Sequence, residues 1–250
     1  MSAALVVGGA GGLGRAIVQR LLDRGRRVIV AGRSASAAPG VERSYVVDAT
    51  KVAWDGFLGM AEADAGTPID AIVFVAGTAA FGRTARIPAE RARSVLELNF
   101  WACAGAATAA AERWAAAGRA GTFVAVLSIV ARRAVPFEAY YAASKAAAAR
   151  FLECLDLEYG TRGARFVAAY PGTLETGFRR TADWHALDAA PGRGSDPAAA
   201  ARAIVGLLEG TRQTRVIGWR ERSIDLADRV APGLYDRVVL RRRVRRTEPG

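Results

Sequence analysis

Several residue types that often carry chemistry are scarce in this chain of 250 residues. Its only histidine is His185, and a lone histidine cannot form a cluster of metal ligands, so the sequence predicts no metal site. The two cysteines, Cys103 and Cys154, fall in predicted helices, and we expect small buried side chains rather than a disulfide. No stretch approaches the roughly 18 apolar residues that a membrane-spanning helix requires. The first predicted strand begins almost at once and leaves no room for a signal peptide, so we expect a cytoplasmic protein.

Positive charge is abundant, with 35 Lys and Arg residues against 24 Asp and Glu, and the net charge is +11. The arginines are spread along the whole chain together with the alanines. This distribution indicates a compositional bias rather than a binding stripe, so no nucleic-acid partner is expected. The exception is the C-terminal basic tail, residues 241–250, which begins Arg241-Arg242-Arg243-Val244-Arg245-Arg246.

Apolar residues precede this tail at a helical spacing that is interrupted at Pro232; they are Ile224, Ala227, Ala231, Leu234 and Val238. An amphipathic segment followed by a basic cluster can lie on an anionic membrane surface. More often such a segment packs over the rim of a site or against a partner subunit. We expect the segment to pack in one of these two ways, with membrane contact as the alternative.

Short apolar runs alternate with alanine-rich helical stretches along the chain. This rhythm predicts an α/β fold of the Rossmann type, a doubly wound parallel sheet with helices on both faces. Because 52% of the residues are hydrophobic, the chain can bury a large core, and we expect a single domain over residues 1–250. The expected strands are Leu5–Val7, Val28–Ala31, Tyr45–Val47, Ala71–Val75, Phe123–Leu127, Phe166–Ala169 and Arg215–Ile217.

A glycine-rich turn, Val7-Gly8-Gly9-Ala10-Gly11-Gly12-Leu13-Gly14, follows the first of these strands and precedes a helical stretch. In this order, bare backbone amides can approach a pyrophosphate, and the helix dipole favours its charge. A second strand about one helix later completes a βαβ unit, so the turn predicts dinucleotide binding. Two spacings fit equally, G-x-x-x-G-x-G through Gly8, Gly12 and Gly14 and G-x-x-G-x-x-G through Gly8, Gly11 and Gly14.

One of the only two lysines, Lys145, stands four residues after Tyr141 in a predicted helix. Residues at i and i+4 share a helix face. An ammonium is a compact cation that can sit beside a phenol, and it pulls the pKa of a tyrosine down from about 10 toward neutrality. The pair therefore predicts a proton donor with its tuning partner.

Two further residues support a site at this position. Ser128 stands at the carboxyl end of an apolar strand, where side chains point into the crevice that binds ligands in open α/β sheets. Asn99 is the only asparagine and lies in the helical stretch 91–101. A buried asparagine needs hydrogen-bond partners, and it can hold a water or bridge to the lysine.

Together these residues make the chain resemble the short-chain dehydrogenase/reductase family in its compact form. The resemblance covers roughly residues 3–217 and keeps the family's order of motifs. These are the glycine turn, Asp48 after the third strand, Asn99, Ser128, Tyr141 with Lys145, and Pro171-Gly172-Thr173-Leu174-Glu175-Thr176. The last segment is similar to the family's P-G-x-x-x-T turn, whose threonine and backbone bind the nicotinamide carboxamide.

The resemblance implies a role for each matched residue. Tyr141 would transfer the proton at the substrate oxygen, Ser128 would hydrogen-bond that oxygen, Lys145 would bind the nicotinamide ribose and lower the pKa of Tyr141, and Asn99 would hold a water in the proton path. The residues expected to bind the cofactor are Gly8, Gly11, Gly12, Leu13, Gly14, Arg33, Ser34, Asp48, Ala49, Ala76, Gly77, Tyr141, Lys145, Pro171, Gly172, Leu174 and Thr176.

The chain departs from the family pattern at two places. Val7 replaces the usual threonine before the first glycine, so one hydrogen bond of the turn is lost or supplied otherwise. Phe74-Val75-Ala76-Gly77 replaces Asn-Asn-Ala-Gly, and only the Ala-Gly part, which lets the backbone approach the cofactor, is kept.

The second strand is followed by Ala31-Gly32-Arg33-Ser34, without an acid to accept from a ribose 2′-hydroxyl and with Arg33 placed to pair with a 2′-phosphate. NADP(H) is therefore expected over NAD(H). The implied function is an NADP(H)-dependent, ketoreductase-like enzyme that interconverts a small-molecule ketone and a secondary alcohol. The alternatives are a non-catalytic nucleotide-binding sensor or scaffold, and an epimerase or dehydratase with transient hydride transfer.

A lid is expected over residues 177–196. Its Phe178, Trp184 and Leu187 suit an apolar substrate, whereas Arg179 and Arg180 can meet an anion or face solvent. The long, alanine-rich helices predicted at 91–118 and 139–159 have more apolar surface than one sheet face can cover. The resemblance implies that they form a four-helix interface, so we expect a homodimer or homotetramer.

Overall fold

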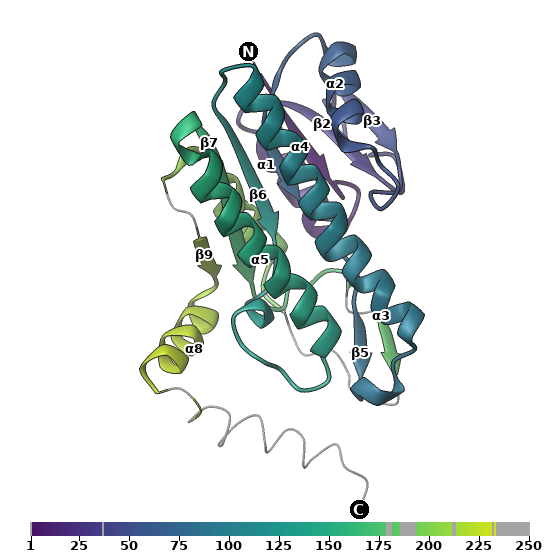
Figure 1. Cartoon of the computed structure of the whole chain (residues 1–250), viewed down its shortest axis with the longest axis vertical. Coiled ribbons are helices and arrows are strands. Elements are labelled where there is room, and N and C mark those ends of the chain that lie inside the picture. Colours follow the sequence, from purple (N-terminus) through teal and green to yellow (C-terminus); the bar gives the residue numbers. More distant parts are fainter. Residues whose placement is uncertain are drawn as a thin grey trace, which may run out of the picture.

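The computed structural model describes residues 2–36, 38–178, 182–185, 194–211, 214–231 and 233 of the chain. In this part, seven parallel strands form one sheet in the order β3-β2-β1-β4-β6-β7-β9 (Figure 1). Its strands are β1 (Ala3–Val7), β2 (Arg27–Gly32), β3 (Arg43–Val46), β4 (Ile69–Phe74), β6 (Gly121–Val126), β7 (Ala164–Pro171) and β9 (Thr214–Ile217). The strand order reverses between β1 and β4, which is where ligands bind in open parallel sheets. The predicted fold class, a doubly wound parallel sheet, is confirmed.

Each strand contributes to two cores because its side chains alternate between the faces of the sheet. In β1, Ala3, Leu5 and Val7 belong to one core, whereas Ala4 and Val6 belong to the other. All five residues are buried. This double burial explains why the strands appear in the sequence as continuous apolar runs rather than as an alternating pattern.

Helices cover both faces of the sheet. One face carries α2 (Trp54–Ala65), α4 (Ala102–Ala116) and α5 (Ala139–Tyr159), and the other carries α1 (Gly12–Leu22) and α7 (Pro197–Glu209). Under α4 and α5, stacked rings of Phe74, Phe123 and Phe166 from three neighbouring strands lie with centroids 6.1 to 6.4 Å apart. Each buried ring contributes about 1.5–3 kcal/mol of hydrophobic stabilisation. None of the described helices is long and apolar enough to cross a membrane.

The predicted helix 139–159 matches α5, but the predicted helix 91–118 is not uniform. It consists of α3 (Ala89–Leu96), one π-helical turn, η2 (Glu97–Trp101), and α4. At the end of this turn, the Ala102 amide donates to the Glu97 carbonyl, five residues back. Such turns accommodate one extra residue and recur at functional sites. The predicted asparagine, Asn99, lies in the middle of this one.

Several elements were not predicted. The short strands β5 (Ala80–Gly82) and β8 (Asp183–His185) pair in parallel, so part of the predicted lid forms a strand. Helix α8 (Trp219–Val230) follows β9. The single turns are η1 (Thr84–Arg86), η3 (Ile129–Ala131) and η4 (Gly160–Arg162). Arg179, Arg180, Leu187 and the tail 241–250 lie outside the described residues, as do the side chains of Trp184 and His185.

Both cysteines are free thiols. The expected burial is confirmed for Cys103 and wrong for Cys154, which is exposed on α5.

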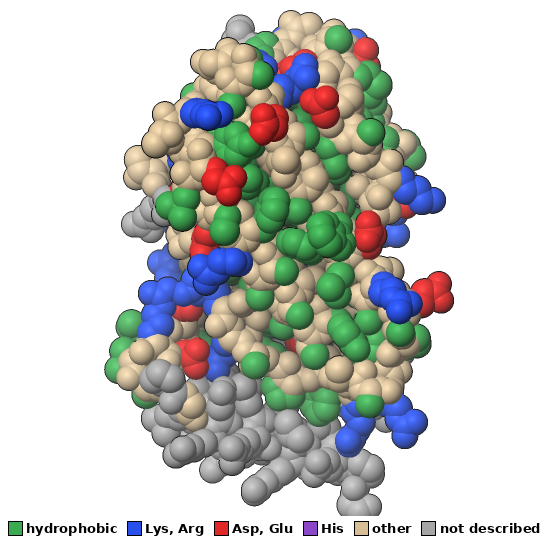
Figure 2. Space-filling model, in the orientation of Figure 1, with side chains coloured by type: hydrophobic (Ala, Val, Ile, Leu, Met, Phe, Trp, Pro, Cys, Tyr) green, Lys and Arg blue, Asp and Glu red, His purple; other side chains and the backbone are tan. Residues whose placement is uncertain are grey.

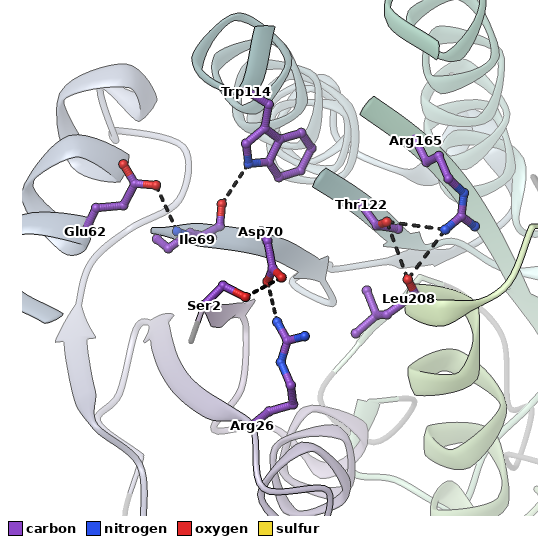
Figure 3. A network of polar contacts seen from close by, with 9 residues as sticks. All are labelled: Ser2, Arg26, Glu62, Ile69, Asp70, Trp114, Thr122, Arg165 and Leu208. Atoms are coloured by element: carbon purple, nitrogen blue, oxygen red, sulfur yellow. Dashed lines mark hydrogen bonds and ion pairs between the residues drawn. The ribbon is translucent and has the colours of Figure 1, made fainter. Parts of the chain in front are cut away.

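The amino-terminal edge of the sheet is closed by polar contacts (Figure 3). The indole of Trp114 donates to the Ile69 carbonyl at 2.7 Å, and the Glu62 carboxylate accepts from the Ile69 amide at 2.8 Å. Asp70 accepts from both Ser2 and Arg26. The cavity at this edge measures only about 160 Å³. A ligand of nucleotide size is therefore accommodated at the opposite edge.

Candidate active site

A cleft of about 970 Å³ lies at the carboxyl ends of the central strands. Its volume is at the upper end of the range for small-molecule and cofactor sites. All the predicted site residues except Asn99 line it. Asn99 stands behind the wall and is bonded to the cleft residue Thr78.

The glycine turn packs so tightly that a side chain would clash at three positions, Gly8, Gly9 and Gly14. Gly8 has φ +91°, and a Cβ there would lie 2.7 Å from the Ala76 amide nitrogen. A Cβ at Gly14 would overlap the Gly8 carbonyl oxygen. The backbone of the turn is thus pressed against the chain after β4, and its outer surface is left bare. Val7, which replaces the family's threonine, contributes its carbonyl as an acceptor for the amides of Val75 and Ala76.

The turn ends in the N-terminus of α1, which is open to an anion. Gly11 is the N-cap residue and offers no capping side chain, and the first turn of α1 carries no acid. A Cβ at Gly12 would lie 3.0 Å from the Thr176 Cβ, whereas one at Gly11 would make only an ordinary contact. Of the two spacings, the steric demand is therefore greater at Gly12 than at Gly11. Uncapped amides and a helix dipole fit a pyrophosphate here.

At the far end of the cleft lie an acidic residue that follows β3, Asp48, and a basic residue that follows β2, Arg33. The Asp48 carboxylate accepts from the Thr50 amide at 3.0 Å and from its hydroxyl at 2.8 Å, which holds the pKa of Asp48 below its ordinary value. Arg33 and Ser34 are exposed and line the cleft. An exposed guanidinium at the end of β2 fits an anionic group such as a 2′-phosphate.

At Gly77, after β4, the side chains of Asn99 and Lys145 both come close to the backbone. A Cβ at this residue would lie 3.1 Å from the Asn99 Oδ1 and 3.3 Å from the Lys145 Nζ. The two polar groups therefore meet the backbone at the same position, and any side chain would displace one of them.

The Asn99 carboxamide makes three hydrogen bonds to the protein. Its Oδ1 accepts from the Thr78 amide at 2.9 Å, and its Nδ2 donates to the Thr78 carbonyl at 2.8 Å and to the Ser144 hydroxyl at 2.9 Å. Ser144 in turn donates to the Tyr141 carbonyl at 2.8 Å. Both amide protons are used, so the side chain connects the loop after β4 to α5.

Tyr141 is held by rings on two sides. It lies in the first turn of α5, 8% exposed, with the Phe81 ring at 5.8 Å and the Phe178 ring at 5.9 Å. Its neighbour Tyr140 packs instead with Ala80 and other residues of a separate apolar cluster and does not line the cleft. The predicted helix register, which places Tyr141 and Lys145 on one face, matches this arrangement.

Ser128 follows β6 in extended conformation, and its hydroxyl lines the cleft. The oxygen accepts a long hydrogen bond, 3.4 Å, from the Val130 amide at the start of η3. The hydroxyl proton can still be donated to a ligand. Ser128 therefore caps η3 and also lines the cleft, the position predicted from the sequence.

Lys145 is a buried amine, 4% exposed, whose Nζ donates to the Val126 carbonyl at 3.0 Å. Burial away from water lowers the pKa of Lys145 to about 8. The nearby Cys103 thiol, whose own pKa burial raises to about 12, remains neutral at physiological pH. A buried amine with a lowered pKa in a cleft is typical of functional sites.

The segment 171–176 closes the cleft opposite the glycine turn. The Glu175 amide donates to the Ser195 carbonyl, and the Ser195 amide donates to the Thr173 carbonyl, each at 2.9 Å. These bonds hold Thr176 against the start of α1. Backbone and hydroxyl groups of this segment can hold a polar ligand group.

Helix α8 contributes a wall of the cleft that sequence reasoning anticipated only in outline, without Glu221 or Asp225. Glu221 and Ile224 line the cleft, and the Glu221 carboxylate folds over Gly172, where a Cβ would overlap it. An ion pair of 2.6 Å between Arg132 and Asp225 attaches α8 to the loop that follows Ser128. The expected packing of this segment over the rim of the site agrees with this wall. Ile224 was the only sequence signal, as an apolar residue at helical spacing.

The model of the short chain dehydrogenase family matches residues 2–185 of this chain. The chain belongs to this family. The match includes the glycine turn, the asparagine, the serine and the tyrosine–lysine pair, so the family that the motifs predicted is confirmed. An uncharacterized oxidoreductase of Myxococcus xanthus is 32% identical over 184 residues, which cover 69% of this chain and 72% of that protein.

Other relatives differ in length. The probable oxidoreductase EphD of Mycobacterium tuberculosis is 27% identical over 192 residues, which cover 72% of this chain but only 32% of EphD. A short-chain dehydrogenase from Burkholderia cenocepacia, solved in complex with NADP, has a TM-score of 0.79 and 25% identity and covers 95% of this chain and 97% of its own. One from Streptomyces avermitilis, 21% identical over the whole of both chains, shares the fold with a TM-score of 0.79.

The burial of Lys145 makes the stability of the protein depend on pH. An unfolded lysine keeps its proton up to about pH 10.5, whereas the folded protein releases it near pH 8. Between these values the unfolded state binds more protons, so the contribution of Lys145 to the free energy of unfolding rises with pH. From pH 8 to pH 10.5, the free energy of unfolding of the unmodified protein should therefore rise by on the order of 3 kcal/mol relative to that of Lys145→Met.

Urea unfolding of the protein without added cofactor, repeated across this pH window, measures the difference. The exposed Lys51→Met is the control and should show no such trend. A stability difference for Lys145→Met that stays constant from pH 8 to pH 10.5 would contradict the assigned cause.

Proposed function

We propose that the protein is an NADP(H)-dependent oxidoreductase that interconverts a carbonyl compound and a secondary alcohol. The observation that carries the proposal is that Tyr141, Ser128 and Lys145 line the same cleft as a bare glycine turn. A proton donor, a hydrogen-bond donor and a cation beside a dinucleotide cradle are the groups that carbonyl reduction needs.

The cofactor side of the cleft supports the choice of NADP(H). A nicotinamide dinucleotide, when bound, supplies or accepts the hydride. The amides at the start of α1 would hold its pyrophosphate, Asp48 and Ala49 would contact the adenosine, and Arg33 would pair with the 2′-phosphate. The similar protein from Burkholderia cenocepacia is described as a complex with NADP, which supports the same preference.

The catalytic side follows from the positions of the side chains. Tyr141 would pass its phenolic proton to the substrate oxygen during reduction and take it back during oxidation, while Ser128 donates a hydrogen bond to the same oxygen. Lys145 would bind the nicotinamide ribose and favour the phenolate of Tyr141 when charged. Its low pKa makes the loss and recovery of a proton easy near neutrality.

Asn99 fits a positioning role because both of its amide protons are bonded to the protein. A water in the proton path would have to be held by its remaining acceptor sites, the second lone pair of Oδ1 or the main-chain carbonyl. Loss of the Asn99 side chain would loosen Thr78 and Ser144, which belong to the two sides of the cleft that Asn99 connects.

Two alternatives remain as proposals of lower rank. A non-catalytic nucleotide sensor would bind the cofactor without turnover, although it would have no need for the proton-donating group beside the buried lysine. An epimerase or dehydratase would hold its cofactor tightly and consume no net NADPH. Net oxidation of NADPH in the presence of a panel of simple ketones separates the proposed function from both alternatives, and a tightly held cofactor separates an epimerase or dehydratase from a sensor.

The first test of this function removes one hydroxyl. Tyr141→Phe deletes the proton donor and keeps the ring that packs between Phe81 and Phe178, so cofactor should still bind. We expect turnover to fall by about 10²–10⁴, the usual cost of losing a general acid. Steady-state kinetics together with NADPH titration by fluorescence measure both quantities.

Tyr140→Phe is the matched control, because it deletes a hydroxyl one residue away that does not line the cleft. It should keep most of the activity. Equal effects of the two substitutions would refute the role of Tyr141.

The second test concerns the choice of cofactor. Arg33→Ala removes the charge placed for the 2′-phosphate, so kcat/KM for NADPH should fall by about 10- to 100-fold while that for NADH changes little. The exposed Arg43→Ala, on β3 and outside the cleft, controls for a general loss of positive charge. Equal kcat/KM for NADPH and NADH in the unmodified protein would disprove the preference.

The third test concerns assembly, which we propose to be a symmetric dimer or tetramer built on α4 and α5. These helices lie side by side on one face, and apolar side chains gather over them (Figure 2). Trp101 is 58% exposed and Leu157 81% exposed. Leu155, also on α5, is buried in the core, so a substitution there would report on folding instead.

Light scattering at micromolar protein should therefore give a multiple of the chain mass, and the double substitution of Trp101→Arg and Leu157→Arg should give monomers. Met60→Arg, which places the same charge on α2, should leave the assembly intact. A monomeric unmodified protein would disprove the interface.

A further inference from the structure

Helix α8 presents two faces of opposite chemistry. The inner face lies against the protein: Glu221 and Ile224 line the cleft, and Asp225 and Asp228 approach Arg132 and its neighbour in the loop after β6. All three acids of α8 are on this face. The outer face is therefore left without negative charge.

The outer face carries a stripe of large apolar side chains. Trp219, Leu226 and Val230 are 76%, 62% and 77% exposed. Their spacings of seven and four residues place them on one side of a helix. This outer stripe differs from the pattern expected from the sequence, in which Ile224 led the apolar positions, because Ile224 faces the cleft.

Arginines border the outer stripe on both sides. Arg220 and Arg222 are exposed, and the Arg229 side chain is 62% exposed while one nitrogen contacts Asp225. The Arg220 guanidinium lies 5.8 Å from the Trp219 ring centroid. The helix thus offers tryptophan and aliphatic groups rimmed by cations.

The sequence beyond α8 has the same sign of charge. Residues 234–250 include six arginines and only two acids. Positive charge is therefore concentrated next to an apolar stripe within one short stretch of the chain.

We propose that the outer face of α8 docks onto an anionic lipid surface. Helices that lie in the membrane interface combine a tryptophan- and leucine-containing face with flanking Lys or Arg. Each basic residue near an anionic leaflet adds to the attraction. The charge complementarity favours lipid over a second copy of this chain, whose own α8 would present the same cations. Docking would hold the cleft, whose wall includes the inner face of α8, beside the lipid.

The test is sedimentation of the full chain with vesicles, without substrate or cofactor, so that its outcome is independent of the proposed function. The protein should bind phosphatidylcholine vesicles that contain about one third phosphatidylglycerol, bind vesicles of phosphatidylcholine alone much more weakly, and be released by high salt. Leu226→Glu should weaken binding by about tenfold.

Val46→Glu is the matched control, because Val46 is 64% exposed on β3, remote from α8, and the substitution changes net charge equally. If the basic chain bound vesicles non-specifically, both variants would be weakened alike, and the proposal would fail. Trp219→Phe provides a second readout: the blue shift of tryptophan fluorescence on vesicle binding should shrink in this variant while binding persists.

Two further outcomes would overturn the proposal. One is equal binding of the unmodified protein to both kinds of vesicle. The other is a change in oligomeric state on Leu226→Glu with no preference for anionic vesicles, which would make the outer stripe an interface between copies.

Discussion

The arrangement of the whole cleft depends on one carboxamide. Asn99 donates to and accepts from the backbone of Thr78 while it donates to Ser144, so the loop after β4 and the helix that carries Tyr141 are fixed to each other. Three hydrogen bonds inside the protein, each contributing about 1 kcal/mol, define this geometry. The π-helical turn makes it possible, because the extra residue lies where Asn99 points inward between two helices.

The rest of the site is positioned relative to this connection between the loop after β4 and α5. The Asn99 oxygen and the Lys145 amine meet at the backbone of Gly77, so the buried cation is positioned by packing rather than by a carboxylate partner. Keeping a buried amine charged costs free energy because water is excluded, and this cost lowers the pKa of Lys145. The wall that α8 forms is held differently, since α8 is attached by the ion pair of Arg132 and Asp225. The wall at the glycine turn is thus steric and built from backbone, whereas the wall at α8 is electrostatic.

Much of this was accessible from the sequence because the signals are local. The glycine turn must be bare because Gly8 and Gly14 contact backbone atoms within the turn or just after the adjacent strand. The relation of Tyr141 to Lys145 follows from helix geometry alone. The strands were recognisable because burial on both faces produces continuous apolar runs. Apart from the contact of Gly8 with Ala76 after β4, these features require knowledge of only one element or one turn at a time.

The sequence by itself therefore determined the sheet, the turn for a dinucleotide and the identity of the paired tyrosine and lysine. Only the tertiary structure decided how the cleft is closed. The π-helical turn at Asn99 has no local signature, and its partner Ser144 is 45 residues away. The attachment of Arg132 to Asp225 spans 93 residues, and no periodicity in either segment indicates which face of α8 turns inward. Such pairings depend on how separately folded elements pack, so no local pattern of residues can specify them.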